Sequence, residues 1–336
     1  MEGKKHTLAK ALLWILAVLV VSELGLRLFG YGNYTAYRPD QRLLWVPEPG
    51  RALTIVHHVP LTISEDGFRY QEKLGPKKPG QVRIFAFGDS STMGWGVDDN
   101  SSYSADLERL LNSNCSNHDF QVVSAGVNAY PNAIVVERAK AVIEDGFQPD
   151  LVIVAYSFNT SFEGFADLQG PARQKFLRQV KIKALIRKSA IYNFLIEGVL
   201  RQAVYYRVRH MLVAGSLDTS KANEDLNVVK FKSRLSDLLE LCQSRRIQML
   251  LLVMASEGQK TELHPFQQAM LEFAQAHNLA AVNMVDSWKS RDHASLFMDH
   301  AHPTAEGHAL IAQELFGAIR RTDSYCGTTP SSALGH

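Results

Sequence analysis

Short apolar runs and longer amphipathic segments alternate along most of the chain. The runs are rich in β-branched and aromatic residues, which is typical of buried strands, and they predict strands at residues 82–87, 120–124, 151–156, 247–254 and 280–285. Apolar residues three and four positions apart predict helices at residues 104–111, 131–143, 228–245, 264–277 and 305–319. Strands that alternate with helices form parallel sheets with helices on both faces. The expected fold class is α/β, with a mainly parallel five-stranded sheet between two helical layers.

The first apolar stretch, residues 8–29, is long enough to cross a membrane. Its 22 residues would rise about 33 Å as a helix, close to the thickness of the hydrocarbon core of a bilayer. Glu23 and Arg27 interrupt it, but they are four residues apart and can pair on one helix face near the interface. A cleaved signal peptide is the alternative, yet no A-x-A-like site follows Val21. We expect an uncleaved transmembrane helix.

Lysines near the start of the chain set the expected orientation. Lys4, Lys5 and Lys10 precede or open the apolar stretch, and the positive-inside rule keeps such residues in the cytoplasm. The remainder of the chain then crosses the membrane. The sequence therefore predicts a single-pass membrane protein with a cytoplasmic N-terminus and an extracytoplasmic domain, in the periplasm or at the cell surface.

The sequence divides into four parts. These are a cytoplasmic tip and anchor at residues 1–29, a β-containing lead-in at 30–80, the main domain at 81–320 and a flexible tail at 321–336. Within the lead-in, residues 65–69 are expected to close a hairpin, with Gly67 at a positive φ. His57 and His58 lack nearby acidic partners, so we expect a strand face that meets a turn, with metal binding a weaker alternative.

Charge is unevenly distributed, although the whole chain carries a net charge of only +2. Residues 173–209 hold ten Lys or Arg and one acid, Glu197. They lie within a helical insertion predicted at about residues 161–225, where apolar residues four apart indicate two or more amphipathic helices. The basic side chains either form a solvated helix face or belong to a lid, or to an arm for a membrane surface or an anionic glycan. Nucleic acid is not an expected partner outside the cytoplasm.

The three cysteines show no metal-ligand spacing. Cys242 falls in a helical pattern and is expected to be a buried thiol. Cys115 and Cys326 lie in polar loops and can pair in an oxidising compartment, but the sequence alone leaves that pairing open.

Three residues form a candidate constellation for nucleophilic catalysis. The strand at 82–87 runs into a small polar loop that contains Ser90, and open α/β sheets bind ligands at the carboxyl ends of their strands. Asp299 and His302 follow the fifth predicted strand and precede the last helix, so they are expected at the same edge. In this arrangement His302 accepts the proton of Ser90, and Asp299 orients the imidazole.

Oxyanion donors are expected from the loops after the neighbouring strands. Gly126 follows the second strand and can bring a bare backbone N–H close to a substrate. Asn159 follows the third and can offer its side-chain amide, and the Ser90 N–H is the third candidate donor.

Each of these residues also has an ordinary structural interpretation. Ser90 can be a turn or N-cap serine, Gly126 a turn glycine and Asn159 a helix cap. Asp299 and His302 can form a simple loop ion pair. Competing side chains are Ser91 for the nucleophile and His293 and His300 for the base, while Asp89 is expected to bond loop amides.

Four blocks occur in order, each after a predicted strand: Gly88-Asp89-Ser90-Ser91, Gly126, Asn159, and Asp299 to His302. Over about residues 82–316 they resemble the SGNH (GDSL-like) hydrolase superfamily. The resemblance implies a flavodoxin-like three-layer α/β/α fold and serine esterase or acyltransferase chemistry with no metal and no cofactor, with these residues in the roles given above. The N-terminal span and residues 66–69 also resemble bacterial membrane-anchored members, some of which take part in O-acetylation or deacetylation of cell-surface polysaccharides.

Three positions depart from the family pattern. Ser157 and Thr160 stand where the third block usually has Gly and Asp, and Ser91 replaces the leucine of GDSL. The sequence also lacks a Gly-x-Ser-x-Gly elbow because Thr92 occupies the place of its second glycine, which disfavours the α/β-hydrolase fold.

These features predict a membrane-anchored serine esterase or acylhydrolase that forms an acyl-enzyme with an O-acyl ester. An O-acetyl ester, for example of a cell-surface polysaccharide, is the first expectation. If the site holds an acceptor hydroxyl and excludes water, the protein is instead an O-acyltransferase. A non-catalytic assembly subunit that keeps the fold and binds glycan or lipid is the third interpretation. The oligomeric state is not determined by the sequence.

Overall fold

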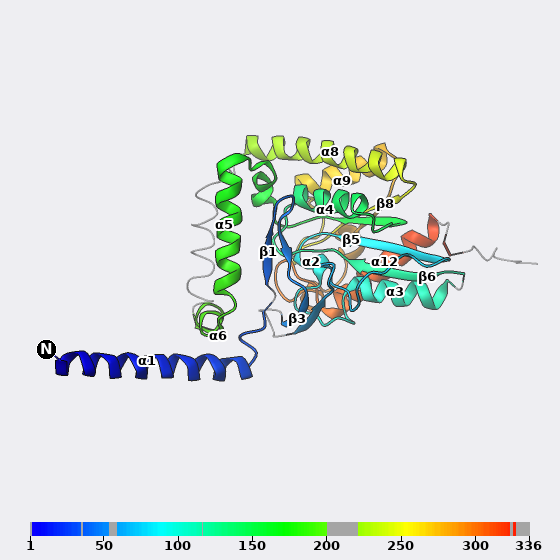
Figure 1. Cartoon of the computed structure of the whole chain (residues 1–336). Coiled ribbons are helices and arrows are strands. Elements are labelled where there is room, and N and C mark those ends of the chain that lie inside the picture. The colour runs from blue at the N-terminus through cyan, green and yellow to red at the C-terminus, as the bar shows by residue number, and fades with distance from the viewer. Residues whose placement is uncertain are drawn as a thin grey trace, which may run out of the picture.

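A parallel sheet of five strands forms the centre of the protein (Figure 1). The computed structural model describes residues 2–34, 36–53, 59–115, 117–199, 221–322 and 325–326. The strands are β5 (Gln81–Phe87), β6 (Asp119–Ser124), β7 (Leu151–Ala155), β8 (Gln248–Val253) and β9 (Ala280–Asn283). Their order is β6-β5-β7-β8-β9, and each neighbouring pair is parallel. Strands such as β7 are apolar and buried throughout because helices cover both faces. This is the order of a flavodoxin-like sheet, so the predicted fold class is confirmed.

Helices cover the sheet in two layers. One layer contains α3 (Tyr103–Asn114) and α12 (Ala305–Arg321), and the other contains α4 (Asn132–Glu144), α8 (Lys221–Ser244) and α9 (Pro265–Ala276) (Figure 1). Side-chain caps begin several of them: Ser102 accepts a hydrogen bond from Ala105 N, and Thr304 accepts one from Gly307 N. Each predicted helix is present, with its ends shifted by a few residues, apart from α8, which begins seven residues earlier than predicted.

The sheet ends differently from the prediction at its last strand. We expected a strand at residues 280–285, but β9 ends at Asn283, whose side chain accepts a hydrogen bond from Val285 N and begins α10 (Met284–Trp288). A second short helix, α11 (His293–Leu296), follows. The loop with Asp299 therefore does not follow the fifth strand directly, because two short helices come between them.

The lead-in forms two antiparallel hairpins. They pair β1 (Tyr37–Asp40) with β2 (Leu44–Pro47) and β3 (Gly50–Leu53) with β4 (Pro60–Ile63). Trp45 packs with the core of the main domain and meets the ring of Tyr130 edge to face. Gly67 has the expected positive φ of 79°, although β4 pairs beyond the turn only through one bridge, from Ile63 to Arg69. His57 and His58 lie outside the described residues.

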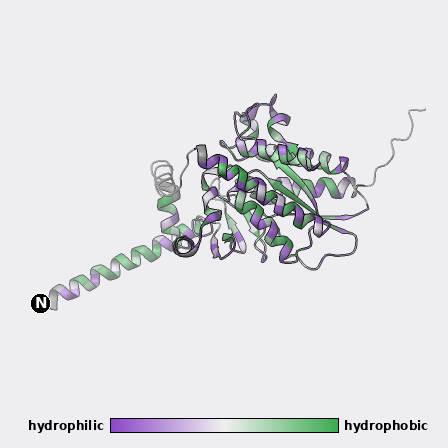
Figure 2. Ribbon diagram, turned by 90° about the horizontal axis from the view of Figure 1, so that it is seen from above, coloured by the Kyte–Doolittle hydropathy of each residue, from purple (hydrophilic) through white to green (hydrophobic). Residues whose placement is uncertain are grey.

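The N-terminal helix and the insertion extend away from the sheet. Helix α1 (Glu2–Leu28) is followed by the lead-in, and the insertion contains η1 (Thr160–Asp167), α5 (Gly170–Ile186), α6 (Ala190–Asn193) and η2 (Phe194–Val199). Figure 2 shows that α1 is apolar along most of its length. Within its span from Lys5 to Leu28, an 18-residue window has a mean hydropathy of 2.1, which suits either a membrane span or a signal sequence. Of the basic stretch, Arg201, Arg207 and Arg209 lie outside the described residues.

Cys115 and Cys326 form a disulfide. It fixes the first part of the tail that was expected to be flexible from residue 321, and the Tyr325 hydroxyl donates to the Asp150 carbonyl. Residues 327–336 lie outside the described part of the chain. Cys242 is a buried free thiol, as predicted, and burial raises its pKa to about 12.

Candidate active site

The turn after β5 presents Ser90 at the start of a short helix, α2 (Ser90–Met93). Asp89 caps this helix, because its Oδ1 accepts a backbone hydrogen bond of 2.9 Å from the first turn. A glycine is needed just before the cap, since a Cβ atom at Gly88 would lie 2.0 Å from Thr92 Oγ1. The Ser90 side chain is half-buried and lies at the carboxyl edge of the sheet.

Hydrogen bonds from several elements fix this turn in place. The Tyr103 hydroxyl donates to Thr92 Oγ1 at 3.1 Å, and Ser124 Oγ donates to the Thr92 carbonyl at 2.9 Å. The buried Arg69 donates to three carbonyls after the turn, those of Met93, Gly94 and Val97. The backbone that carries Ser90 is therefore held rigidly before any substrate binds.

Ser90, His302 and Asp299 meet in one chain of hydrogen bonds. Ser90 Oγ lies 2.8 Å from His302 Nε2, and His302 Nδ1 lies 2.8 Å from Asp299 Oδ2 and 2.9 Å from Oδ1. Asp299 Oδ1 also accepts the backbone N–H groups of Ala301 and His302 at 3.0 Å each. One short loop thus supplies both the imidazole and the group that orients it.

The charge of Asp299 determines which nitrogen of His302 carries the proton. Burial raises the pKa of Asp299, but the hydrogen bonds from His302 and from two backbone N–H groups outweigh it and hold the pKa well below its usual value. The ionised carboxylate places the proton on Nδ1. Nε2 is then free to accept the hydroxyl proton of Ser90, which is the arrangement that a general base requires.

The competing side chains have other partners. Ser91 is 1% exposed and its Oγ donates to the Ala301 carbonyl at 2.9 Å, so this hydroxyl ties the Ser90 turn to the His302 loop. His293 is buried between Gly258 N and the Trp288 carbonyl. The side chain of His300 is 76% exposed, with Nδ1 3.9 Å from Asp299 Oδ1. Neither imidazole is bonded to Ser90.

Two backbone N–H groups remain available beside Ser90. Within the described part of the chain, neither the Ser90 N–H nor the Gly126 N–H has a hydrogen-bond partner. Gly126 lies against the turn so closely that a Cβ atom would be 2.4 Å from Met93 N and 2.9 Å from the Asp89 carbonyl oxygen. Only glycine fits this contact, and the fit keeps its N–H next to α2.

The side chain of Asn159 is held by Asp89 and does not cap the helix that follows. Its Nδ2 donates to Asp89 Oδ2 at 3.0 Å, while η1 begins without a side-chain cap from Asn159. Nδ2 also donates to Ser157 Oγ, at the longer distance of 3.3 Å. Asp89 Oδ2 also accepts the Phe158 N–H at 3.0 Å, so this buried carboxylate positions the loop after β7.

Ser157, which stands where the family usually has glycine, belongs to the same hydrogen-bond network. Ser157 Oγ donates to the Tyr130 carbonyl at 2.5 Å and accepts the Asn159 N–H at 3.1 Å. Its backbone N–H donates to Asn132 Oδ1 at 2.8 Å. The Ser157 hydroxyl therefore adds a bond to the Asn159 loop that glycine could not make.

Glu163 joins the same loop to the start of α4. One carboxylate oxygen accepts Asn132 N at 2.7 Å and Asn132 Nδ2 at 2.9 Å, and the other accepts Ala133 N at 3.0 Å. The side chain is 4% exposed. Burial raises the pKa of Glu163 to about 7, despite the three donors that favour the carboxylate.

Replacing Glu163 by glutamine is expected to change the pH dependence of stability. The folded-state pKa lies above the usual 4.5, so the unfolded chain loses this proton first and the Glu163 contribution to the free energy of unfolding falls as pH rises from 4.5 to about 7. The difference in unfolding free energy between wild type and E163Q should change by about 3 kcal/mol over this range. Urea unfolding at several pH values, with the disulfide intact, measures it. A constant difference would contradict the shift.

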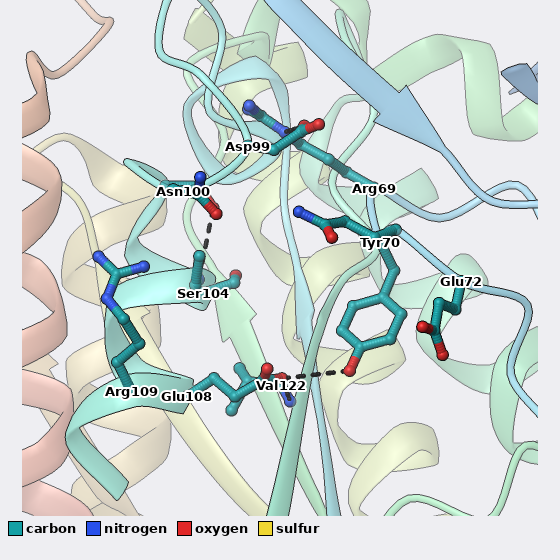
Figure 3. A pocket seen from close by; sticks show the side chains of 12 residues that line it. Arg69, Tyr70, Glu72, Asp99, Asn100, Ser104, Glu108, Arg109 and Val122 are labelled. Atoms are coloured by element: carbon teal, nitrogen blue, oxygen red, sulfur yellow. Dashed lines mark hydrogen bonds and ion pairs between the residues drawn. The ribbon is translucent and has the colours of Figure 1, made fainter. Parts of the chain in front are cut away.

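A separate cavity lies beside the lead-in loop. It has a volume of about 360 Å³, and its lining includes Arg69, Tyr70, Asp99, Ser104 and Glu108 (Figure 3). The five predicted site residues are absent from its lining. The cavity is therefore distinct from the Ser90 site.

Sequence patterns did not reveal the contacts through which several residues support the site. Ser91, Glu163 and Asn132 act through contacts with residues distant in the chain, and no local spacing indicates such contacts. Arg69 was part of the lead-in pattern, but its bonds to the Ser90 turn were not foreseen. The sequence offered one signal for such contacts, namely a polar residue that is expected to be buried close to one of the four blocks. A buried polar group nearly always has a hydrogen-bond partner.

Comparison with known proteins identifies a family. The model of the GDSL-like lipase/acylhydrolase family matches residues 86–310. This range includes Ser90, Gly126, Asn159, Asp299 and His302. No curated protein sequence matches the chain.

Solved structures resemble the chain at low sequence identity. An acetyl xylan esterase, AlAXEase, has a TM-score of 0.45 at 13% identity and covers 71% of this chain and all of its own. A two-domain esterase active on acetylated mannans has a TM-score of 0.46 at 17% identity, with 74% of this chain and 52% of its own covered. AlinE4, an SGNH-hydrolase family esterase, has a TM-score of 0.37 at 21% identity, with 74% and 98% covered.

Proposed function

Because the chain belongs to the GDSL-like lipase/acylhydrolase family, we propose that it is a membrane-anchored serine esterase that cleaves O-acyl esters through an acyl-enzyme on Ser90. The single observation that carries this proposal is the 2.8 Å contact between Ser90 Oγ and His302 Nε2, with Asp299 bonded to the opposite nitrogen. A hydroxyl bonded to an oriented imidazole is an activated nucleophile.

In the proposed reaction, Ser90 Oγ attacks the ester carbonyl while its proton passes to His302 Nε2. The bond between the carbonyl carbon and the alcohol oxygen then breaks, and His302 returns the proton to the leaving alcohol. The acyl group remains on Ser90. A water molecule that gives its proton to the same imidazole attacks this second ester, which releases the carboxylic acid and restores the serine.

Donors around Ser90 supply the electrostatic part of the proposed mechanism. The unpaired N–H groups of Ser90 and Gly126 are suited to the oxygen that becomes negative during attack. The Asn159 amide can join them by giving up its longer bond, the 3.3 Å contact with Ser157 Oγ. Each such donor is typically worth about a hundredfold to a thousandfold in kcat. Because the turn and the Asn159 loop are already fixed, these donors need little rearrangement.

We place the catalytic domain outside the cytoplasm. The apolar helix α1, preceded by lysines, supports an anchor with its N-terminus inside. The disulfide between Cys115 and Cys326 supports an oxidising compartment, because cytosolic thiols are kept reduced. O-acetyl esters of cell-surface polysaccharides are accessible there, and we propose them as the substrate class.

A time course with an activated acetyl ester tests the function. Purified protein in detergent should release the alcohol catalytically, and a fluorophosphonate should stop it. Adding an acetyl-free oligosaccharide separates the two fates of the acyl group, because a transferase would yield acetylated sugar in place of acetate. Absence of both hydrolysis and transfer would contradict the proposal.

A further inference from the structure

The end of helix α1 is bonded to the insertion through specific contacts. Glu23 accepts hydrogen bonds from Ser189 Oγ at 3.0 Å, Ala190 N at 2.9 Å and Ile191 N at 3.1 Å, so it caps the start of α6. Arg27 pairs with Glu23 as predicted, at 2.8 Å, and also donates to a backbone carbonyl of the insertion at 2.6 Å. These contacts place α6 next to the last turns of α1 and would be lost if the helix were cleaved off.

Helix α5 runs across this end of α1. Figure 1 shows α5 crosswise to α1 and between α1 and the sheet, and Figure 2, seen from above, views α5 nearly end on while α1 extends away from it. If α1 crosses a bilayer, a helix in this position lies along the bilayer surface, on the side from which α1 emerges.

The end of α5 that reaches α6 exposes large apolar side chains. Ile182 is 49% exposed, Leu185 60% and Ile186 43%. Outside residues 8–29, the exposed large apolar side chains in the described part of the chain all lie in or next to the insertion. These are Ile182, Leu185, Ile186, Leu195, Leu226 and Val229. Exposed apolar groups confined to one side of a protein mark an interaction surface.

The charged residues of α5 and α6 themselves are all basic. Residues 168–196 contain seven Lys or Arg and no acid. Lys181 and Lys188 are exposed on either side of Leu185 and Ile186. Apolar side chains flanked by lysine and arginine are typical of helices that lie on anionic membranes, where each basic residue near the surface adds about 1 kcal/mol of attraction.

We propose that the surface formed by the C-terminal half of α5 and by α6, here called the α5–α6 surface, rests on the anionic bilayer that α1 enters. The proposal rests on the membrane anchor proposed above but not on esterase activity. The occupant is the lipid headgroup region, because the surface is continuous with the emerging end of α1 and has the complementary charge.

Contact between the α5–α6 surface and the bilayer would hold the Ser90 turn near the membrane. Trp95 N donates to the Ser90 carbonyl at 3.0 Å, and the Trp95 side chain packs with Tyr34. Tyr31, next to Tyr34 in this cluster, meets the ring of Phe194 in η2 edge to face. A backbone bond and packed aromatic side chains therefore join the catalytic turn to η2, which directly follows α6. Esters carried at the bilayer surface would then be the accessible substrates.

A fluorescent probe on α5 tests this placement in the full-length protein. The variant Leu185→Cys is labelled with NBD and reconstituted into nanodiscs of phosphatidylglycerol and phosphatidylcholine. The disulfide and the buried Cys242 leave the new thiol as the reactive one. Two control variants are labelled in the same way. Leu16→Cys, within α1, gives the signal of a probe inside the bilayer, and Ser113→Cys, exposed on α3 far from α5, gives the signal of a probe in water.

The expected result is a blue shift of the Leu185→Cys emission and protection from aqueous iodide, close to the values for Leu16→Cys. In K181Q/K188Q protein, or without phosphatidylglycerol, the shift should decrease. If the Leu185→Cys probe behaves like the Ser113→Cys probe while the Leu16→Cys probe is protected, the surface proposal is wrong and the anchor stands. An exposed Leu16→Cys probe would overturn both. Hydrolysis of a soluble ester, measured on the same samples, reports esterase function independently.

Discussion

Replacing Ser90 with alanine is expected to lower kcat for an activated acetyl ester by about five to six orders of magnitude. The change removes the atom that forms the acyl-enzyme, and loss of a nucleophile in a serine hydrolase costs this much when water must attack directly. The turn should stay folded, because its bonds come from Asp89, Thr92 and Arg69 and not from the Ser90 side chain. Steady-state kinetics with the disulfide intact measure the effect.

Ser91→Ala is the matched control for this substitution. It removes a neighbouring hydroxyl whose bond to the Ala301 carbonyl steadies the contact between two loops. We expect kcat to fall by about tenfold or less, the value of one buried hydrogen bond. If S91A were inactive and S90A active, the nucleophile would have been assigned to the wrong serine.

Replacing Asp299 with asparagine is expected to lower kcat by about four orders of magnitude. An asparagine amide can donate to His302 Nδ1, which moves the imidazole proton to Nε2 and prevents that nitrogen from accepting the Ser90 proton. The loss should appear in kcat, and the rate of labelling by a fluorophosphonate should fall with it.

Asp286→Asn is the control for removing a carboxylate from this region. Asp286 is exposed and pairs with Lys289 on α10, so its loss should leave kcat within about twofold. Equal decreases in kcat for D299N and D286N would indicate a general effect of charge. An unchanged kcat for D299N would contradict the role given to Asp299.

The sheet was predictable because its signal is local. Each strand is a short apolar run, and the alternation with helices determines the parallel order of such a sheet. The meeting of Ser90 and His302, 212 residues apart, followed from topology, since the carboxyl ends of parallel strands lie on one edge. Family resemblance added the roles of Gly126 and Asn159.

Long-range side-chain bonds were not predictable in the same way. Helices α10 and α11 begin at the caps Asn283 and Asp292 and have only five and four residues. Helices this short are too small to be recognised from residue propensities. The pairing of Cys115 with Cys326 remained open because spacing in sequence does not fix distance in space. Glu23 was expected to pair with Arg27 alone, and its bonds to α6 depend on how the insertion folds back.

The most direct measurement is the site of covalent modification. The full-length protein is treated with a fluorophosphonate, digested and mapped by mass spectrometry. We predict one adduct per chain, on Ser90, which forms more slowly while excess acetyl ester competes for the site and which is absent from S90A. An adduct on Ser91 or on any other residue, or no adduct in protein that hydrolyses the ester, would contradict this prediction.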